Sequence, residues 1–276
     1  MKRACVIGWP IEHSRSPIIH GHWLKRYGID GSYTKVAVDP GDVDRFLCGL
    51  AEAGYAGCNV TIPHKEAAYR AATLCDDSAV AVEAANTLWL EDGKLAAANT
   101  DTYGFMTNLG VEAPGWETYD RPAAILGAGG AARAIVHGFL QAGVGEVRVF
   151  NRTRERAEEL ASHFGARVRA CDWSQREKLS AEAGVLVNTT SLGLKGEGSV
   201  GMALDGLGER CVVADIVYVP LETVFLAEAR QRGLRTVRGL GMLLHQAVPG
   251  FEKWFGVRPE VDGELFAAVS ADIPKS

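Results

Sequence analysis

The feature that most constrains the fold is a glycine-rich turn between a short apolar run and a helical pattern. Residues 123–126 lead directly into Gly127-Ala128-Gly129-Gly130-Ala131-Ala132, which matches G-x-G-x-x-G/A. In this pattern the first glycine permits a tight turn, the second lets the backbone approach a pyrophosphate, and the small third residue lets the helix pack on the strand. The helix N-terminus adds unpaired N–H groups and partial positive charge. Such a turn can also serve packing alone, but between a strand and a helix it favours a dinucleotide site. The predicted contacts are Gly127, Ala128, Gly129, Gly130 and Ala131.

The rest of the chain indicates an α/β fold, because short apolar runs alternate with helical patterns. The predicted strands are 4–7, 33–38, 57–62, 87–90, 95–98, 123–126, 146–150, 167–170, 185–188, 211–216 and 235–237. The predicted helices are 16–27, 42–53, 103–109, 131–142, 154–164, 221–232, 241–255 and 262–271. Asp92-Gly93 is a hairpin signal between two of the strands. The segment 110–122 is rich in Gly, Pro and polar residues and is predicted to be a linker or domain boundary.

The residues after the next predicted strand indicate which dinucleotide binds. An NAD site usually carries Asp or Glu about 20 residues after the first glycine, to hold the ribose 2′-hydroxyl. Here, 24 residues on (151 − 127), the chain has Asn151-Arg152-Thr153-Arg154 and no carboxylate. Arginine forks suit a 2′-phosphate, so these four residues predict NADP. The alternative is that Arg152, Arg154 and Arg156 form a solvated helix start, which is disfavoured because cations there oppose the helix dipole unless an anion is bound.

Polar residues follow several other strands, where open α/β sheets bind ligands. Asn188-Thr189-Thr190-Ser191 is one such cluster, and an ordinary Ser/Thr turn explains it equally well. In the first hundred residues, a lysine and an aspartate, Lys65 and Asp101, could together transfer a proton. Each also has a plain structural interpretation: Lys65 could be a solvated helix residue, and Asp101 the N-cap of the helix at 103–109. Ser16 could likewise be only a helix N-cap before Pro17.

Composition excludes several classes of partner. The chain has 29 Lys and Arg against 34 Asp and Glu, a net charge of −5, which disfavours binding to nucleic acid or to an anionic membrane. No apolar run approaches the ~20 residues that span a bilayer, and the run at 4–7 is too short for a signal peptide. The six cysteines form no C-x-x-C pair, which favours reduced thiols in a cytoplasmic protein. His20-x-His22 has no accompanying ligand cluster, so no metal is expected.

Taken in order, the motifs resemble those of the shikimate dehydrogenase family. The matching segments are Gly8–Pro17 with its two serines, Asn59–Lys65 as N-V-T-x-P-x-K, Asn99–Asp101 as N-T-D, Gly127–Ala132, Asn151–Thr153, Asn188–Ser191, Asp215–Pro220 and Gly239–Gln246. They cover nearly the whole chain, and the ordered set is specific although single segments are not. Two apolar departures, Ala85 where the family has Val and Leu194 where it has Met, concern packing rather than chemistry.

The resemblance implies a two-domain α/β fold and a reaction. Residues 1–102, completed by 239–276, would form the substrate-binding domain, and 103–238 an inserted Rossmann domain for NADP. The reaction implied is the reversible, NADP-dependent reduction of 3-dehydroshikimate to shikimate in aromatic amino-acid (chorismate) biosynthesis. Lys65 would donate the proton to the oxygen at C3, Asp101 would hold the lysine and a substrate hydroxyl, and the protein would act as a monomer or homodimer.

The resemblance also implies the remaining site residues. The substrate ligands besides Lys65 and Asp101 would be Ser14, Ser16, Thr61, Asn86, Tyr218 and Gln246. Further cofactor contacts would be Asp77, Thr189, Ser191, Ile216, Gly239 and Met242, although a solvated loop explains Asp77 equally well.

Three alternatives remain open at the level of sequence. A quinate/shikimate dehydrogenase paralogue with relaxed substrate or NAD/NADP choice would carry the same motifs. Another Rossmann oxidoreductase, such as an amino-acid or methylene-folate dehydrogenase, is disfavoured by the two serines and the Lys65/Asp101 pair. An NADP-sensing regulatory module without turnover is disfavoured because that pair is intact.

Overall fold

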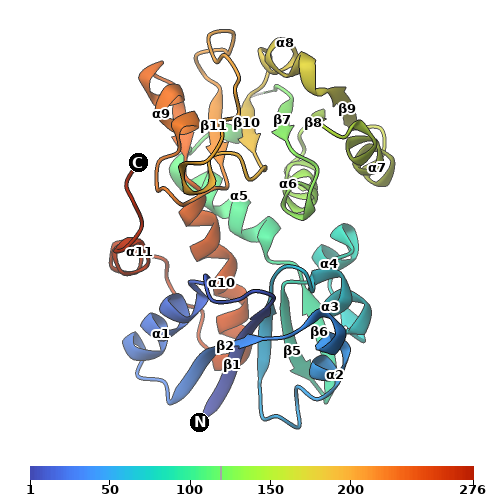
Figure 1. Cartoon of the computed structure of the whole chain (residues 1–276), viewed down its shortest axis with the longest axis vertical. Helices are drawn as coiled ribbons and strands as arrows, with labels where there is room; N and C mark the ends of the chain where they lie inside the picture. The colour runs from blue at the N-terminus through green and yellow to red at the C-terminus, as the bar shows by residue number, and fades with distance from the viewer. Residues whose placement is uncertain (119) are drawn as a thin grey trace. The chain divides into compact units, whose positions relative to one another are not determined.

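The chain divides into two compact units in a computed structural model that describes residues 1–118 and 120–276. Unit 1 comprises Met1–Asp101 and Leu244–Ala271, and unit 2 comprises Thr102–Leu243 and Asp272–Ser276. In Figure 1, unit 1 takes in the blue strands and the red C-terminal helices, whereas the green-to-orange elements belong to unit 2. The sequence analysis assigned Thr102, 239–243 and 272–276 to the first domain, whereas by their packing they lie in unit 2.

Unit 1 is built on a mixed sheet with the order β2-β1-β3-β5-β6-β4. Its strands are β1 (Lys2–Gly8), β2 (Gly31–Ala37), β3 (Gly57–Val60), β4 (Leu74–Cys75), β5 (Thr87–Glu91) and β6 (Lys94–Ala98). Strand β1 pairs in parallel with β2 and β3, whereas β5 runs antiparallel to both β3 and β6. The β5–β6 turn has positive φ at Asp92 (50°) and Gly93 (74°), which is the backbone that a two-residue hairpin needs. This confirms the predicted hairpin.

Among the described residues, six helices lie wholly or mostly in unit 1. They are α1 (Ser16–Arg26), α2 (Val43–Cys48), α3 (Lys65–Ala71), α4 (Asp77–Val82), α10 (Gly239–Phe255) and α11 (Gly263–Ser270), with a short 3-10 turn η1 at Pro40–Asp42. The helix predicted at 42–53 ends early, at Cys48, because the chain turns at Gly49 and again at Gly54, whose φ is 77°. Strand β4 and helix α4 were not predicted, since two and six residues are too few for a periodic pattern.

The approach of α10 to the sheet of unit 1 depends on a glycine. A Cβ at Gly57 would lie 2.1 Å from both the Leu88 carbonyl oxygen and Trp254 Nε1. Trp254 Nε1 donates a hydrogen bond of 2.8 Å to that same carbonyl. The glycine therefore lets the buried indole of α10 cross β3 and bond to β5.

Unit 2 is a fully parallel sheet with the order β12-β11-β10-β7-β8-β9. The strands are β7 (Ala123–Leu126), β8 (Val147–Asn151), β9 (Val168–Asp172), β10 (Val185–Asn188), β11 (Val212–Asp215) and β12 (Arg235–Val237). Counted from the first strand of the unit, this is the doubly wound order 3-2-1-4-5-6 read in reverse, the Rossmann arrangement. Its switch point lies between β7 and β10, where ligands bind in such sheets. The predicted α/β class with an inserted Rossmann unit is confirmed.

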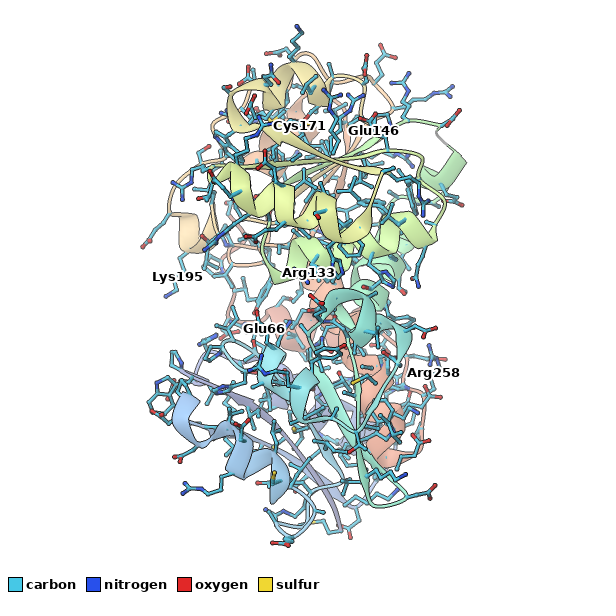
Figure 2. All side chains as sticks on the ribbon, turned by 90° about the vertical axis from the view of Figure 1, so that its right-hand side faces the viewer. Glu66, Arg133, Glu146, Cys171, Lys195 and Arg258 are labelled. Carbon is cyan, nitrogen blue, oxygen red and sulfur yellow. The ribbon has the colours of Figure 1, made fainter. Side chains whose placement is uncertain are left out.

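Helices cover both faces of the unit 2 sheet. They are α5 (Asp101–Glu112), α6 (Gly130–Gln141), α7 (Arg154–Phe164), α8 (Arg176–Ser180) and α9 (Val224–Gln231), with 3-10 turns at Trp116–Thr118 (η2), Trp173–Gln175 (η3) and Leu194–Gly196 (η4). Two separate apolar clusters pack on the strands, one with Phe139 of α6 and the other with Phe225 of α9. Glu146, labelled in Figure 2, and Glu182 hold the guanidinium of the buried Arg148 between them.

The segment predicted to be a linker, 110–122, is more ordered than its composition indicates. Helix α5 continues to Glu112, and the indole of Trp116 is buried with an edge-on contact of 5.6 Å to the ring of Phe139. Residue 119 of this segment lies outside the described residues. Burial of the large apolar indole is favourable enough to tether this Gly- and Pro-rich connection to the core of unit 2.

Candidate active site

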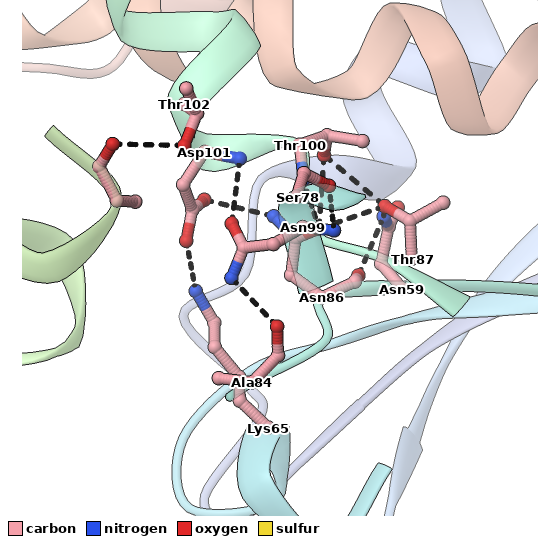
Figure 3. A network of polar contacts seen from close by, with 11 residues as sticks. Asn59, Lys65, Ser78, Ala84, Asn86, Thr87, Asn99, Thr100, Asp101 and Thr102 are labelled. Atoms are coloured by element: carbon pink, nitrogen blue, oxygen red, sulfur yellow. Dashed lines mark hydrogen bonds and ion pairs between the residues drawn. The ribbon is translucent and has the colours of Figure 1, made fainter. Parts of the chain in front are cut away.

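The centre of the candidate site in unit 1 is an ion pair between a helix start and a strand end. Lys65 is the first residue of α3, and Asp101 follows β6 through Asn99-Thr100 and begins α5. Lys65 Nζ donates to Asp101 Oδ2 at 2.5 Å, as Figure 3 shows. The two residues are 36 positions apart in sequence. Asp101 is buried, whereas the lysine side chain keeps 26% of its surface exposed, so its ammonium can still meet a ligand.

Amide and hydroxyl groups fix the orientation of Asp101. Asn86 Nδ2 donates to Asp101 Oδ1 at 2.9 Å, and the backbone N–H of Asp101 donates to Asn99 Oδ1 at 3.1 Å. Asn86 Oδ1 in turn accepts the backbone N–H of Thr100 at 2.8 Å (Figure 3). Both oxygens of the carboxylate are thus occupied by donors from α3 and from the start of β5. The N-cap interpretation of Asp101 is wrong, because the helix already begins at this residue and the carboxylate bonds to side chains instead.

The serine-bearing segment shows a second departure from the sequence analysis. Helix α1 has Arg15, not Ser16, at its N-cap, and no side chain caps it. Ser16 is already helical, and its N–H donates to Ser14 Oγ at a long 3.4 Å. The reason is that the backbone of Arg15 takes helical angles (φ −94°, ψ −5°), so the helix starts one residue earlier than Pro17 suggests. The Ser16 hydroxyl is therefore not used in capping.

The other predicted substrate ligands lie on different elements. Thr61 follows β3, and its N–H donates to the Ile7 carbonyl at 2.9 Å, which joins the ends of β1 and β3. Gln246 lies on the part of α10 that belongs to unit 1, and its side chain is buried. Tyr218 follows β11 in unit 2 and is half-buried. Unit 1 thus contains Ser14, Ser16, Thr61, Lys65, Asn86, Asp101 and Gln246.

The glycine-rich turn in unit 2 has the backbone that a pyrophosphate requires. Gly127 has φ +109°, and a Cβ there would lie 2.6 Å from Thr189 Oγ1. Cβ atoms built at Gly129 and Gly130 meet nothing within 4 Å, so the space beside the start of α6 is open. Gly129 is the N-cap and offers no side-chain acceptor, so the first N–H groups of this 12-residue helix keep their capacity for an anion. Arg133, labelled in Figure 2, adds a cation in the next turn of α6. These features fit a dinucleotide phosphate.

The four residues predicted to recognise the 2′-phosphate differ in their availability. Asn151 Nδ2 donates to the Thr153 carbonyl at 2.7 Å and so shapes the loop between β8 and α7. The Arg154 guanidinium bonds to Glu158 at 2.7 Å and also to Asp172, and both bonds raise its pKa further above the ordinary arginine value. Arg152, in contrast, is exposed and makes no hydrogen bond or ion pair within residues 1–118 and 120–276.

A further candidate cation was not among the predicted contacts. Arg156 is exposed and, like Arg152, is unpaired within the described part of the chain. The sequence did carry a signal that favours Arg156 over Arg154. Arg154 and Glu158 are four residues apart on one helix, a spacing that favours an ion pair. An arginine in such a pair is less available to a ligand than a neighbouring arginine such as Arg156.

The remaining predicted cofactor contacts lie mostly in the loops after β10 and β11. Asn188 Nδ2 donates to Asp215 Oδ1 at 3.0 Å, and Thr223 Oγ1 donates to Asp215 Oδ2 at 2.7 Å, so Asp215 ties the two loops together. Burial raises the pKa of Asp215 to about 7, although the donors from Thr223, Val217 and Asn188 act in the opposite direction. A Cβ at Gly239 would lie 2.4 Å from the Ile216 carbonyl oxygen, so α10 begins against this loop.

Four of the predicted contacts differ in exposure. Ser191 is exposed, Thr189 is half-buried with its hydroxyl donating to the Leu126 carbonyl at 2.8 Å, and Met242 is buried on α10. Asp77 is exposed on the first turn of α4 in unit 1, where the neighbouring Asp76 is the helix N-cap. The structure gives Asp77 no distinguishing contact.

Among the described residues, His, Cys, Asp and Glu side chains form no group of three that could hold a metal ion. None of the helices within 1–118 and 120–276 combines the length and the apolar composition that crossing a bilayer needs.

Comparison with known proteins gives three family matches in order along the chain. Residues 6–88 match the model "Shikimate dehydrogenase substrate binding domain", 113–195 match "Shikimate / quinate 5-dehydrogenase", and 239–263 match "Shikimate 5'-dehydrogenase C-terminal domain". Together these matches cover more than half of the chain.

Relatives and solved structures agree with the family models. Shikimate dehydrogenase (NADP(+)) of Brucella canis is 56% identical over 278 aligned positions, which cover 100% of this chain and 96% of the relative. Shikimate 5-dehydrogenase of Thermus thermophilus, solved in complex with NADP(H) and shikimate, has a TM-score of 0.87 at 35% identity and covers 97% of this chain and 98% of that one. Quinate dehydrogenase of Corynebacterium glutamicum, solved with NAD, has a TM-score of 0.88 at 26% identity, with 97% of each chain covered.

These full-length similarities agree with the ordered motifs, the Rossmann sheet and the paired lysine and aspartate. The chain therefore belongs to the shikimate dehydrogenase family.

Proposed function

We propose that this protein is an NADP-dependent shikimate dehydrogenase, which catalyses the reversible reduction of 3-dehydroshikimate to shikimate in aromatic amino-acid (chorismate) biosynthesis. The observation that carries the proposal is the Lys65–Asp101 pair, whose lysine stays partly exposed while its carboxylate is buried and fixed by Asn86. Sequence similarity to a full-length NADP-dependent relative at 56% identity supports the same substrate and cofactor.

The two units would divide the work. Unit 1 would hold the substrate, since most of the proposed ligands lie in it, and unit 2 would hold NADP through its Rossmann sheet. The substrate domain would then be residues 1–101 with 244–271, and the NADP domain 102–243 with 272–276, close to the bounds that the resemblance implies (1–102 with 239–276, and 103–238). The boundary between the two units falls inside α10, between Leu243 and Leu244, because this one helix continues from unit 2 into unit 1.

NADP would be held in unit 2 by the glycine-rich turn, which has open space beside it, and by arginine side chains without an ion-pair partner in the described residues. The pyrophosphate would take the N–H groups at Gly129, Gly130 and Ala131, and the 2′-phosphate would take Arg152 with Arg156. Arg154 would contribute to the shape of the loop, because its guanidinium already bonds to two carboxylates. Residues proposed for the rest of the cofactor are Gly127, Ala128, Asn151, Thr153, Thr189, Ser191, Ile216, Gly239, Met242 and Asp77. When bound, the nicotinamide supplies or accepts the hydride at the C3 carbon of the substrate.

The chain's own residues would manage the proton. Lys65 would give a proton to the C3 oxygen during reduction and take it back during oxidation, because its ammonium is the exposed end of the pair. Asp101 would keep the lysine in place through Oδ2. The same carboxylate would accept a hydrogen bond from a substrate hydroxyl. Before the proton moves, the positive charge of Lys65 would stabilise negative charge developing on that oxygen.

Polar groups around this pair would orient the ring. Ser14 and Ser16 would bind the substrate carboxylate, and the Ser16 hydroxyl is not used in capping α1. Thr61, Asn86, Gln246 and Tyr218 would bind the hydroxyl groups. The partner is thus a small carboxylated and hydroxylated molecule rather than a nucleic acid, and the protein would act as a monomer or homodimer. All six cysteines are unbridged in the structure, which supports a reducing, cytoplasmic location.

A steady-state assay tests the proposal and separates it from the alternatives. The purified chain is given shikimate or quinate with NADP+ or NAD+, and reduced cofactor is followed by absorbance. We expect the highest kcat/KM with shikimate and NADP+. Higher kcat/KM with quinate or NAD+ would instead favour the activity of the quinate dehydrogenase relative, which was solved in complex with NAD. NADP+ binding without turnover of either substrate would indicate a regulatory module and overturn the proposal.

A further inference from the structure

A buried tyrosine of unit 1 lies next to the candidate site and has no role in the reaction as described above. Tyr33 lies on β2 opposite Ala4 of β1, and its side chain is only 8% exposed. Strand β1 separates β2 from β3 in the sheet. The small side chain of Ala4 leaves room for the phenol to reach across β1, where its hydroxyl bonds to Asn59 Oδ1 on β3 at 2.6 Å.

Backbone groups fix the direction of the hydrogen bonds that leave Asn59. Asn59 Nδ2 lies 3.1 Å from the Asn86 carbonyl oxygen, which can only accept, so this end of the amide is the donor. The other end, Oδ1, therefore faces Tyr33, and the phenol must donate to it. The same Nδ2 also donates to Thr87 Oγ1 at 3.1 Å, which leaves the Thr87 proton for another acceptor.

The chain of bonds continues from Thr87 to the catalytic pair. Thr87 Oγ1 donates to Asn86 Oδ1 at 3.0 Å, and this oxygen is identified by the Thr100 backbone N–H that it also accepts. The other end of the Asn86 amide, Nδ2, must then donate to Asp101 Oδ1, at 2.9 Å. The second carboxylate oxygen of Asp101, Oδ2, accepts the hydrogen bond from Lys65. Figure 3 shows this sequence of contacts from Asn59 to Lys65. A single orientation of each amide satisfies all of these bonds.

The phenol is neutral, and its ring is fixed by packing. Burial raises the pKa of Tyr33 well above its ordinary value. Tyr33 therefore keeps the proton that it donates to Asn59. The ring is held in place by His20, which stacks on it with centroids 3.9 Å apart and planes 16° from parallel. Burial lowers the pKa of His20 to about 3, so this stacking partner is an uncharged imidazole.

We propose that Tyr33 is a positioning residue for the dehydrogenase reaction: its hydroxyl sets the orientation of Asn59 and, through Thr87 and Asn86, that of Asp101 and Lys65. This inference rests on the proposed function. It predicts that one buried hydroxyl affects both substrate binding, through Asn86, and turnover, through Asp101 and Lys65.

The test compares Tyr33→Phe with a matched control. Tyr33→Phe removes only the hydroxyl and keeps the ring that stacks on His20. Because it leaves the buried Asn59 oxygen without its donor, we expect kcat/KM for shikimate to fall roughly 5- to 100-fold, with a raised KM, a lowered kcat and an unchanged Kd for NADP+. Tyr27→Phe is the control, since Tyr27 lies in the same unit and its hydroxyl accepts the Glu260 N–H at 3.1 Å, outside this chain of bonds. It should leave both kinetic constants unchanged.

A second variant and a double mutant distinguish positioning from general loss of stability. Thr87→Val has nearly the same shape and interrupts the same chain between Asn59 and Asn86. If the two residues act through one chain, the losses of Tyr33→Phe and Thr87→Val in kcat/KM will not multiply in the double mutant. Losses that multiply, or a Tyr33→Phe enzyme with a lower Tm and unaltered constants for shikimate, would overturn the inference while leaving the proposed function intact. A wild-type chain that does not turn over shikimate would overturn both.

Discussion

At the scale of single residues, the candidate site in unit 1 pairs Lys65 with Asp101, and amide and backbone N–H groups hold the aspartate in place. Asp101 is buried with both oxygens bonded, and Lys65 is the exposed member of the pair. Interactions that strengthen only in the transition state appear in kcat, whereas interactions equal in both states appear in KM. A proton donor belongs to the first kind, so the two roles open to Lys65 give different kinetics.

The first prediction is that Lys65 acts in the chemical step. General acid–base catalysis contributes about 10²–10⁴-fold, so Lys65→Ala should lower kcat by that order while shikimate still binds. Asp101→Asn keeps the shape but removes the charge that holds the lysine, and its loss should not multiply with that of Lys65→Ala. Steady-state kinetics and direct titration of shikimate measure both effects. Normal kcat with only a raised KM would make Lys65 a binding group.

A second residue-scale prediction concerns the buried carboxylate of Asp215. Its pKa is raised from 3.8 to about 7 because burial disfavours the charged form. The folded chain therefore binds more protons than the unfolded chain between about pH 4 and pH 7, and the contribution of Asp215 to stability falls as pH rises through this window. Asp215→Asn cannot ionise, so its stability relative to wild type should rise by up to about 4 kcal/mol from pH 4 to pH 8.

Denaturant unfolding of both proteins at several pH values between 4 and 8 measures this difference. Comparing slopes against pH removes the constant effect of the altered bond to Thr223, which the substitution changes at every pH. Parallel curves for wild type and Asp215→Asn would show that this carboxylate does not titrate in the window. A relative loss of stability at pH 8 would contradict the sign of the prediction.

At the scale of elements, the cations proposed to recognise the 2′-phosphate lie around the start of α7, and neighbouring elements decide which of these side chains are available. The start of α7 presents three arginines, but Asp172 at the end of β9 and Glu158 within α7 bind one of them. Strands β8 and β9 are paired with Asn151 opposite Asp172, so the register of the sheet brings that carboxylate to the loop. Strands β8 and β9 and helix α7 together therefore determine which arginines at this loop are free to bind a ligand.

The prediction at this scale is that Arg152, rather than Arg154, distinguishes NADPH from NADH. Charge-assisted contacts are worth about 1.5–3 kcal/mol each, so Arg152→Ala should weaken NADPH binding roughly tenfold or more and leave NADH nearly unchanged. Arg154→Ala is the matched control, because its guanidinium is already bonded to carboxylates and should affect the two cofactors alike. Kd values for both cofactors, measured by fluorescence titration, decide it. An equal loss of both cofactors in Arg152→Ala would contradict the assignment.

At the scale of the whole molecule, two units with separate sheets and separate cores are joined through α5 and α10. Asp101 closes unit 1 and is also the first residue of α5, which continues into unit 2, and α10 returns from unit 2 to unit 1 at Leu244. Each unit has its own loops of proposed ligand contacts: the segments 14–16, 59–65 and 86 in unit 1, and 127–131 and 188–191 in unit 2. Ligand binding should therefore be detectable unit by unit.

The corresponding prediction uses amide hydrogen exchange of the full chain. NADP+ alone should slow exchange in unit 2, at the segments 127–132 and 188–191, because a ligand that binds the native state stabilises what it contacts. Shikimate alone should slow exchange in unit 1, around 14–16 and 59–65. Arg152→Ala should reduce the effect of NADP+ and leave that of shikimate unchanged. Protection of unit 2 alone by shikimate would contradict the division of roles.

Much of the fold could be predicted because its signals are local. The turn at Gly127 needs a backbone with φ +109°, and Asp92-Gly93 adopts two positive φ angles, so these residues mark a strand–helix turn and a hairpin wherever they occur. The parallel strands of unit 2 are buried on both faces and appear as continuous apolar runs. Helix α7 and strand β12 have the predicted bounds, since clear periodicity and flanking turns define both ends.

What could not be predicted depended on which elements become neighbours. The sequence by itself determined the α/β class, the dinucleotide turn and, through the ordered motifs, the family. The ordered motifs also implied the Lys65–Asp101 pair, which the structure brings together across 36 residues. Only the tertiary structure decided that Asp172 occupies Arg154 and that Tyr33 reaches Asn59 across β1. The physical reason is that backbone angles and side-chain periodicity are set by a few adjacent residues, whereas these contacts depend on sheet order and strand register, which form only when distant segments pack against one another.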